Sequence, residues 1–288
     1  MRYIKELSNR NRIVSENTCK SFYKPSDSSH YTIKFVLSGV EKCIINKREI
    51  SIFPDSFAML NTGTDYNSVI DSITPVNTIS LSFDTNFVSD FNDAHRLTDN
   101  ALLDGKSNQS PLFIETLYPF VGDIHYNVMN LKNQLDRGVD NEMLMNEYLY
   151  HCLLNYYGVY QKEVVQKLSK LSFTKAKTKE EILKRLAVAK DYINSNYDKN
   201  VLLEDISACC CLSVNHLLRT FKEAYGISPY QYLMQLRISR AKYLLKSTDY
   251  PLSEIVCLIG FENTSSFIRL FKQTTKMTPA KFRKEHYV

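Results

Sequence analysis

The sequence predicts an α+β protein, in which an N-terminal β-barrel with two appended helices precedes an all-α C-terminal domain of two helix-turn-helix subdomains joined by a long helix. Three observations support this prediction. Short apolar runs separated by turn residues fill positions 31–83, apolar residues at helical spacing fill 124–159, and one helical pattern occurs twice within 201–286. Strands at such spacing are typical of sandwiches and barrels, and a repeated pattern of this kind is typical of paired helix-turn-helix motifs.

The predicted strands lie at 31–37, 43–45, 48–52, 57–60, 66–70 and 77–83, and residues 111–116 can supply a last strand. Residues 84–111 are polar and irregular. The order of a strand, Gly39, a hairpin and the segment 54–61 resembles the cupin barrel, and this resemblance implies a domain that senses a small-molecule effector. The sequence contains no metal cluster, phosphate loop or carboxylate pair that identifies the effector, so its binding residues stay unassigned and no cofactor is expected.

Two helices are expected after the barrel. Apolar residues at steps of 4, 3 and 4 define the first, and Gly138 ends it. The second has a heptad-like stripe, which suits either a dimer contact or packing on the barrel of the same chain. Because further apolar residues flank this stripe, we favour a homodimer whose contact residues are Met145, Leu149, Cys152, Tyr156 and Val159.

The chain divides into three predicted parts: an effector-sensing and dimerisation domain at 1–168, a polar, basic linker at 169–180, and a DNA-binding domain at 181–288. Charge follows the same division. Residues 1–171 carry 17 Lys and Arg against 20 Asp and Glu, which is −3, whereas residues 172–288 carry 19 against 11, which is +8. This asymmetry indicates that only the C-terminal part meets a polyanion.

Seven cysteines, an odd number without repeated spacing, favour reduced thiols in a cytosol. Three of them are adjacent at 209–211, and on a helix they would point in different directions, which disfavours a shared metal or redox site. The first twelve residues lack the apolar core of a signal peptide, and no apolar run is long enough to span a bilayer. We therefore expect a cytoplasmic protein without membrane contact.

The two helix-turn-helix motifs are expected at about 202–224 and 252–275, and their longer helices divide into two faces in the same register. One face is apolar and packs on its own subdomain, through Val214, Leu217, Phe221 and Ala224 in the first copy and Thr264, Phe267, Phe271 and Thr274 in the second. The other face carries side chains that can bond base edges in a major groove, namely Asn215, Leu218, Arg219, Ser265, Ile268 and Arg269. Its neighbours are expected to meet phosphates, namely Ser213, His216, Lys222, Ser266 and Lys272.

One continuous helix is predicted between the two copies, capped by Ser228, opened by Pro229 and ended before Pro251. Some 18 residues at 1.5 Å each hold the two reading helices roughly 27 Å apart. With the thickness of each subdomain added, this approaches the roughly 34 Å between successive major-groove openings. One chain is then able to grip two adjacent turns of double-stranded DNA.

The second copy of the C-terminal repeat contains, in this order, Gly260-Phe261, Phe267, Arg269, Phe271-Lys272, Thr278-Pro279, Phe282 and Arg283. With these residues the repeat resembles the AraC/XylS family of bacterial transcription regulators. This resemblance implies an activator that contacts RNA polymerase and responds to a small-molecule effector. Two positions depart from the family pattern: Cys211 stands where a glycine is frequent, so its turn is less able to be left-handed, and Leu218 stands where a polar base-reader is frequent.

Two other classes of protein stay open. A metal-dependent cupin enzyme fused to a DNA-binding module would need two or three histidines and a carboxylate around one ion, whereas the six histidines here are scattered. A ligand-independent DNA-binding protein would have a barrel filled by large side chains.

Overall fold

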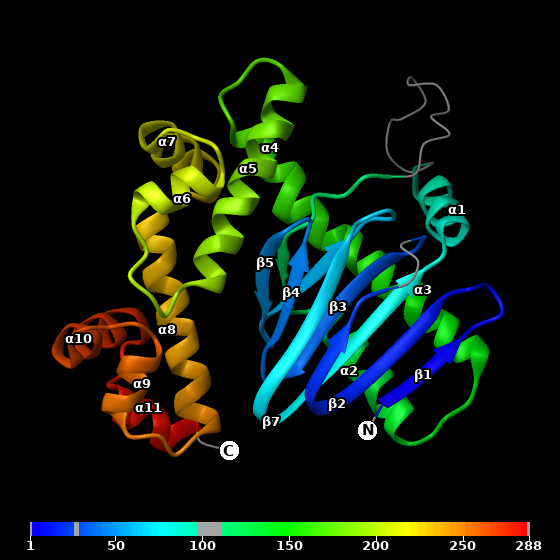
Figure 1. The fold of residues 1–288 in the computed structure, drawn as a ribbon, viewed down its shortest axis with the longest axis horizontal. Coiled ribbons are helices and arrows are strands. Elements are labelled where there is room, and N and C mark those ends of the chain that lie inside the picture. Colours follow the sequence, from blue (N-terminus) through cyan, green and yellow to red (C-terminus); the bar gives the residue numbers. More distant parts are fainter. Residues whose placement is uncertain (1, 26–28, 97–110, 287–288) are drawn as a thin grey trace. The chain divides into compact units, whose positions relative to one another are not determined.

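The computed structural model describes residues 2–25, 29–96 and 111–286. The chain forms two compact units, Met1–Ser169 and Lys170–Val288 (Figure 1). The first contains a mixed set of strands and helices, and the second is entirely helical over its described residues.

The first unit is built on an antiparallel sheet whose strand order is β1-β2-β7-β3-β6-β8, with β4 paired to β7 and β5. The long strand β7 joins its parts, because its first half pairs with β4 and its second half with β3, while β2 follows both halves. The strands are β1 (Arg2–Glu6), β2 (Arg12–Tyr23), β3 (Tyr31–Ser38), β4 (Glu41–Ile45), β5 (Arg48–Ile52), β6 (Ser56–Leu60), β7 (Tyr66–Phe83) and β8 (Leu117–Pro119).

The predicted strands between 31 and 83 are confirmed, with the last two joined into β7. Three other predictions were wrong. Strands β1 and β2 were missed, residues 85–96 form helix α1 (Thr85–Arg96) rather than an irregular segment, and the last strand begins at Leu117 instead of residue 111. The remainder of the segment from 97 to 110 lies outside the described residues.

The sheet has two faces with different contents, because side chains alternate along each strand. Register places Ile33 beside Leu81 and Met59, and Phe35 beside Ile79 and Phe57. This apolar face is covered by α2 (Asp123–Asp136) and α3 (Glu142–Tyr160), as Figure 1 shows, with the Phe57 and Tyr156 rings 6.1 Å apart. The opposite face carries polar side chains at one end and an apolar cluster at the other.

The predicted stripe of α3 faces its own sheet. The side chains of Met145, Leu149, Cys152 and Tyr156 are at most 1% exposed within one chain, and Val159 is half-buried. A side chain already covered in this way has no surface left for a second copy. The assignment of the four buried residues to a dimer contact was therefore wrong, because they pack on the same chain. A dimer role for Val159 stays a prediction.

After α3 the first unit continues through a π-helical segment η2 (Gln161–Val165) into α4 (Gln166–Lys170). The second unit contains α5 (Ala176–Ser195), α6 (Leu203–Cys209), α7 (Val214–Tyr225), α8 (Pro229–Ser247), α9 (Leu252–Leu258), α10 (Thr264–Thr275) and α11 (Pro279–His286). Residues 176–180, which we expected in the linker, are the first turns of α5. Their Ala, Lys and Glu side chains favour a helix without forming an apolar stripe.

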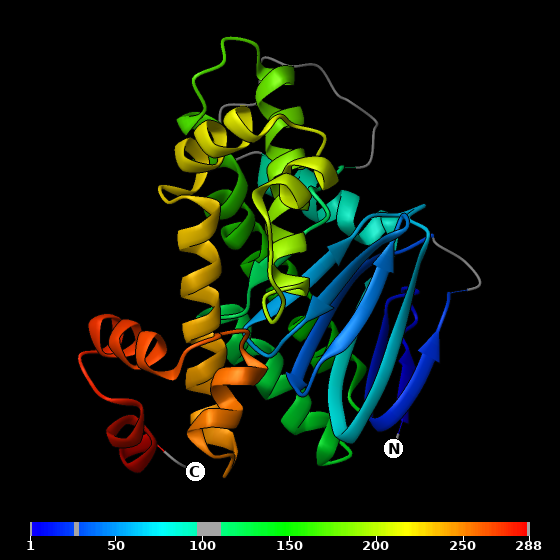
Figure 2. The same cartoon turned by 60° about the vertical axis from the view of Figure 1, so that its left-hand side comes forward.

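The predicted central helix is confirmed as α8. The Ser228 hydroxyl accepts from the Gln231 amide while the Gln231 side chain accepts from the Ser228 amide, and Pro229 occupies the first turn. At 1.5 Å per residue its 19 residues span about 28 Å. Helices α6 and α7 lie at one end of α8, and α9 to α11 lie at the other (Figures 1 and 2).

Within the described residues the cysteines are free thiols, and no group of three or more His, Cys, Asp or Glu side chains is placed to hold a metal ion. The described helices include none that is long and apolar enough to cross a membrane.

Candidate nucleic-acid interface and ligand pocket

The first candidate reading helix, α7, begins at a capped turn. The Ser213 hydroxyl accepts from the His216 amide at 3.3 Å. Before it, Cys211 has a φ of +54°, so this turn is left-handed although the residue is not glycine. The Arg185 guanidinium of α5 donates to the Cys211 carbonyl at 2.8 Å, which holds the turn in place. The turn is therefore left-handed even though Cys211 is less able than glycine to adopt this conformation.

The two predicted faces of α7 are present. Leu217, Phe221 and Ala224 are fully buried, and Val214 is half-buried. On the opposite face Asn215, Arg219 and Lys222 are exposed, and Leu218 is half-buried. An exposed guanidinium and amide on one helix face are available to bond base edges, and Lys222 lies one turn further on.

His216 does not lie on this exposed face as a free donor. Its ring packs at 6.0 Å from the Phe173 ring, and its Nε2 atom is buried without a hydrogen-bond partner among the residues that the structure describes. A ring nitrogen held there cannot reach a phosphate without turning out, so the phosphate role that we expected for His216 is wrong for this conformation. Ser213 keeps an exposed position at the start of the same helix.

The second candidate reading helix, α10, is capped by Asn263, whose side-chain oxygen accepts from the Ser265 amide at 2.8 Å and the Ser266 amide at 3.2 Å. Arg269 and Lys272 are exposed together with these two serines. Ile268 is half-buried against the apolar core of this subdomain, so only part of it is presented to solvent.

The buried stripe of α10 is narrower than predicted. Phe267 and Phe271 are fully buried, whereas Thr264 and Thr274 are exposed. The Thr274 hydroxyl donates a hydrogen bond to the Leu270 carbonyl of the same helix at 2.9 Å, so it needs no partner in the core. Two phenylalanines fill the space that the four-residue stripe was expected to fill.

A buried arginine on α8 connects the second motif to the loop that follows α5, and it was not identified from the sequence. Arg237 donates to the carbonyls of Tyr197 and Lys199, both at 2.7 Å, and stacks 5.5 Å from the Phe261 ring centre. Burial lowers the pKa of its guanidinium from the usual value. The only signal in the sequence is an arginine within an apolar helix, which is also typical of a solvated side chain.

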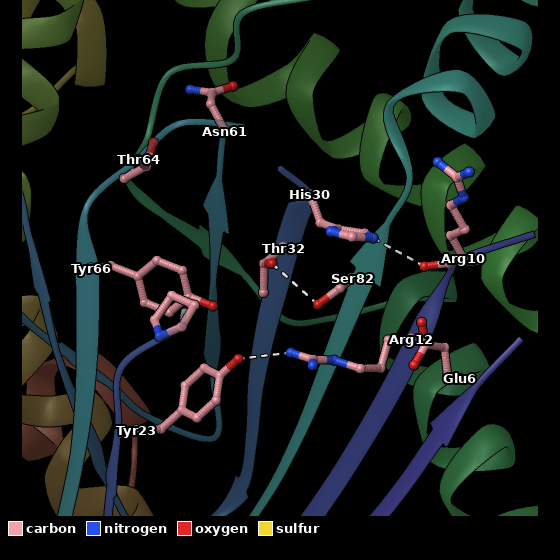
Figure 3. A pocket seen from close by; sticks show the side chains of 11 residues that line it. Glu6, Arg10, Arg12, Tyr23, His30, Thr32, Asn61, Thr64, Tyr66 and Ser82 are labelled. Carbon is pink, nitrogen blue, oxygen red and sulfur yellow. Dashed lines mark hydrogen bonds between the residues drawn. The ribbon is translucent and has the colours of Figure 1, made fainter. Parts of the chain in front are cut away.

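The first unit contains a polar pocket on the face of the sheet opposite α2 and α3 (Figure 3). Its volume is about 150 Å³, and a smaller space of about 20 Å³ shares five of its residues, namely Arg12, Tyr23, Thr32, Tyr66 and Ser82. Register explains the polarity, because Arg12 and Thr32 both lie opposite Ser82 and Lys34 lies opposite Ser80.

The smaller space beside the pocket is lined by a buried ion pair. Lys34 Nζ lies 2.9 Å from a Glu41 carboxylate oxygen, and their side chains are 5% and 4% exposed. Burial alone would lower the pKa of Lys34, but the Glu41 carboxylate outweighs burial and raises it. Burial also raises the pKa of the neighbouring Cys43 thiol to about 12, so this thiol is neutral.

The second unit thus contains two helix-turn-helix motifs at opposite ends of α8, and each motif presents an exposed basic helix after a short helix and a turn. The family model described as "Helix-turn-helix domain" matches residues 206–285. This match and the names of the relatives confirm, for the C-terminal domain, the resemblance to AraC/XylS transcription regulators that was read from the sequence.

Curated relatives carry the same domain. Over 93 residues the chain is 38% identical to the bifunctional transcriptional activator/DNA repair enzyme AdaA of Bacillus subtilis, which is 32% of this chain and 44% of that protein. Over 156 residues it is 26% identical to the lactose operon transcription activator of Staphylococcus xylosus, which is 54% of this chain and 52% of that protein. The chain thus spans about half the length of these relatives.

Among solved structures, the chain is similar to the C-terminal domain of the two-component response regulator yesN from Fusobacterium nucleatum. The identity is 33%, the coverage is 33% of this chain and 93% of that chain, and the TM-score is 0.32.

Proposed function

We propose that this protein is a sequence-specific transcription regulator, in which the second unit binds double-stranded DNA and the first unit binds a small-molecule effector. One observation carries the DNA-binding part: Arg219 and Arg269 occupy the same register on two capped helices and are both exposed, with Lys222 and Lys272 one turn beyond. A length of about 28 Å for α8 is compatible with two adjacent major-groove openings.

In this proposal the base-reading side chains are Asn215, Leu218, Arg219, Ser265, Ile268 and Arg269, and the phosphate contacts are Ser213, Lys222, Ser266 and Lys272. The half-buried positions of Leu218 and Ile268 suit contact with a thymine methyl group, which needs only part of a side chain. The two arginines suit guanine, whose O6 and N7 accept two hydrogen bonds from one guanidinium.

We further propose that the first unit is a cupin-like sensor. The antiparallel sheet and its polar pocket support this assignment. The similarity to the lactose operon transcription activator extends beyond the helix-turn-helix domain and supports an activating role, with RNA polymerase as a partner. The curated relatives named as regulators favour this function over a metal-dependent enzyme. A homodimer stays a proposal, and it would have to use residues other than the buried side chains of α3.

The experiment is a comparison of operator and random DNA by fluorescence anisotropy over a range of salt concentrations. Arg269→Ala is expected to abolish preference for the operator while weak nonspecific binding persists, because a base contact carries discrimination. Lys272→Ala is expected to weaken binding to both DNAs and to reduce the salt slope by about 1, since one phosphate contact is lost.

Lys284→Ala is the matched control, because Lys284 is an exposed lysine of α11 outside both reading helices. It should leave preference for the operator unchanged. Equal losses on operator and random DNA for Arg269→Ala would contradict the base-reading role.

A further inference from the structure

The polar pocket of the first unit contains a cation without a carboxylate partner. Arg12 is half-buried in the pocket wall, and its Nη2 atom donates to the Tyr23 hydroxyl at 2.7 Å (Figure 3). Among residues 2–25, 29–96 and 111–286, no carboxylate forms an ion pair with this guanidinium. Glu6, which lies opposite Arg12 across β1 and β2, is exposed. A partly desolvated cation with a neutral partner favours an anion beside it.

A fully buried cation, Lys34, lines the smaller space beside the pocket and is already compensated. Lys34 pairs with Glu41 and also donates to the Ser80 hydroxyl at 3.2 Å. The pair contributes no net charge to the smaller space. The other charged residues that line the two spaces are the exposed Arg2, Glu6 and Arg10 and the half-buried Glu16. Since none of the described carboxylates pairs with Arg12, its guanidinium is the half-buried cation that a ligand can reach.

The hydrogen-bond donors of Arg12 and Tyr23 indicate which shape of anion fits here. A guanidinium has five N–H groups in one plane, and the bond to Tyr23 uses one of them. Because the Tyr23 oxygen accepts from Arg12, its own O–H is available to donate to a ligand. Two parallel N–H donors match the two oxygens of a carboxylate, and a neighbouring hydroxyl adds a third bond.

The remaining lining defines the size and the rest of the ligand. A volume of about 150 Å³ corresponds to about ten water-sized spheres, so the ligand is a small molecule. The Tyr23 and Tyr66 rings, 6.4 Å apart, form an aromatic wall, and the Thr32 and Ser82 hydroxyls, 3.3 Å apart, form a polar one. Hydroxyls both donate and accept, so they suit further polar groups on the same ligand.

We propose that this pocket binds a small organic carboxylate, with Arg12 and Tyr23 donating to its two oxygens. The inference rests on the proposed function only in making this ligand the effector. A neutral polyol is the competing class, and it would fill the pocket while leaving the Arg12 charge uncompensated.

The test uses the full-length protein and pairs of probes in which each carboxylate is replaced by its neutral amide: acetate and acetamide, succinate and succinamide, glucuronate and glucuronamide. Inorganic phosphate serves as an anion of different geometry. Binding is read as a shift of the unfolding temperature and confirmed by calorimetric titration. We expect at least one carboxylate to bind while its neutral counterpart binds at least about tenfold more weakly, because the charge-assisted bonds are lost.

Variants identify the residues. Arg12→Gln should lower carboxylate affinity by about tenfold or more, and Tyr23→Phe, which keeps the ring, should lower it severalfold. Lys20→Gln is the matched control, because Lys20 is exposed on the same strand and does not line the pocket. If Arg12→Gln fails to fold, Tyr23→Phe alone decides the assignment.

Four outcomes would overturn the assignment: equal binding of charged and neutral probes, binding of phosphate alone, no binding by any probe, or unchanged carboxylate affinity in folded variants of both residues. Operator binding is measured on the same preparations. Retained operator binding with absent carboxylate binding rejects the pocket assignment and leaves the DNA-binding function standing, whereas the reverse result rejects the proposed function.

Discussion

Gly260→Ala should destabilise the second unit more than any other glycine-to-alanine change in its turns. Gly260 lies between α9 and α10 with a φ of +75°, and a Cβ atom there would stand 2.6 Å from the Asp198 carbonyl oxygen and 2.8 Å from its carbon. It would also stand 2.9 Å from the Arg237 Nη2 atom. Two of these atoms are backbone, so they cannot swing aside as the end of a flexible side chain can.

The expected cost has two parts. Alanine in a left-handed conformation costs about 1–2 kcal/mol, and forcing an extra carbon into a filled space costs about 1–3 kcal/mol more. Gly226 separates them, because its φ is +77° and a Cβ atom there meets no described atom within 4 Å. Gly226→Ala should therefore lose only the first part, about 1–2 kcal/mol, and Gly260→Ala about 3 kcal/mol.

The assay is urea unfolding of the full-length variants, followed by circular dichroism and by hydrogen exchange of peptides from α9 and α10. Hydrogen exchange assigns the loss to this motif, since local stability differs between parts of one protein. Operator affinity should fall more for Gly260→Ala than for Gly226→Ala, because the displaced turn carries α10. Equal losses of stability in the two variants would refute the close contact with Asp198.

Three further predictions concern other parts of the chain. Cys211→Gly should stabilise the second unit by up to about 1 kcal/mol in the same urea assay, because it relieves a left-handed residue at a small cost in chain entropy; a loss of stability would contradict this. Lys34→Met should cost about 3–5 kcal/mol in the unfolding of the first unit, because it leaves the Glu41 carboxylate buried alone, and Lys34→Met with Glu41→Leu should recover much of this loss. The pKa of Lys34 is raised on folding, so the stabilisation by this pair is fully present below the ordinary lysine value of 10.5 and is lost only as pH rises through the higher folded value. Between pH 7 and about 10, the free energy of unfolding should therefore show no decrease that is due to Lys34. Met145→Ala should cost about 2–5 kcal/mol independently of protein concentration, because the side chain is buried within one chain; a cost that depended on concentration would restore the dimer interpretation.

The strands that the sequence did not reveal have a physical reason in common. In β2, the inward side chains include Arg12 and Glu16, which line the polar pocket, so the strand lacks an apolar face of the usual kind. In β7, an exposed middle segment separates two apolar halves, so the sequence pattern predicted two strands where the structure has one. A polar cavity inside a sheet thus removes the alternation from which strands are predicted.

The apolar stripe of α3 shows a different limit. Its spacing correctly predicted a helix with one buried face. However, packing on a sheet and packing in a dimer require the same apolar pattern, so the pattern does not distinguish between them. Only the three-dimensional structure places Tyr156 against Phe57 and so decides between the two. The burial of residues was predictable here, whereas the identity of what covers them was not.

The helix-turn-helix repeat was predicted best, because capping and turn residues mark the ends of the helices in each copy. The copies nevertheless divide their glycines differently. Each copy has a left-handed residue before its reading helix and another after it. In the first copy these residues are Cys211 and Gly226, and in the second copy they are Gly260 and Lys276. The turn that requires glycine is Gly260, where Asp198 and Arg237 leave no room for a side chain, whereas Cys211 faces Arg185 through its carbonyl and keeps its own side chain exposed. The second reading helix is therefore held by a close backbone contact and the first by a single guanidinium, so substitutions at the first turn should be tolerated where those at the second are not.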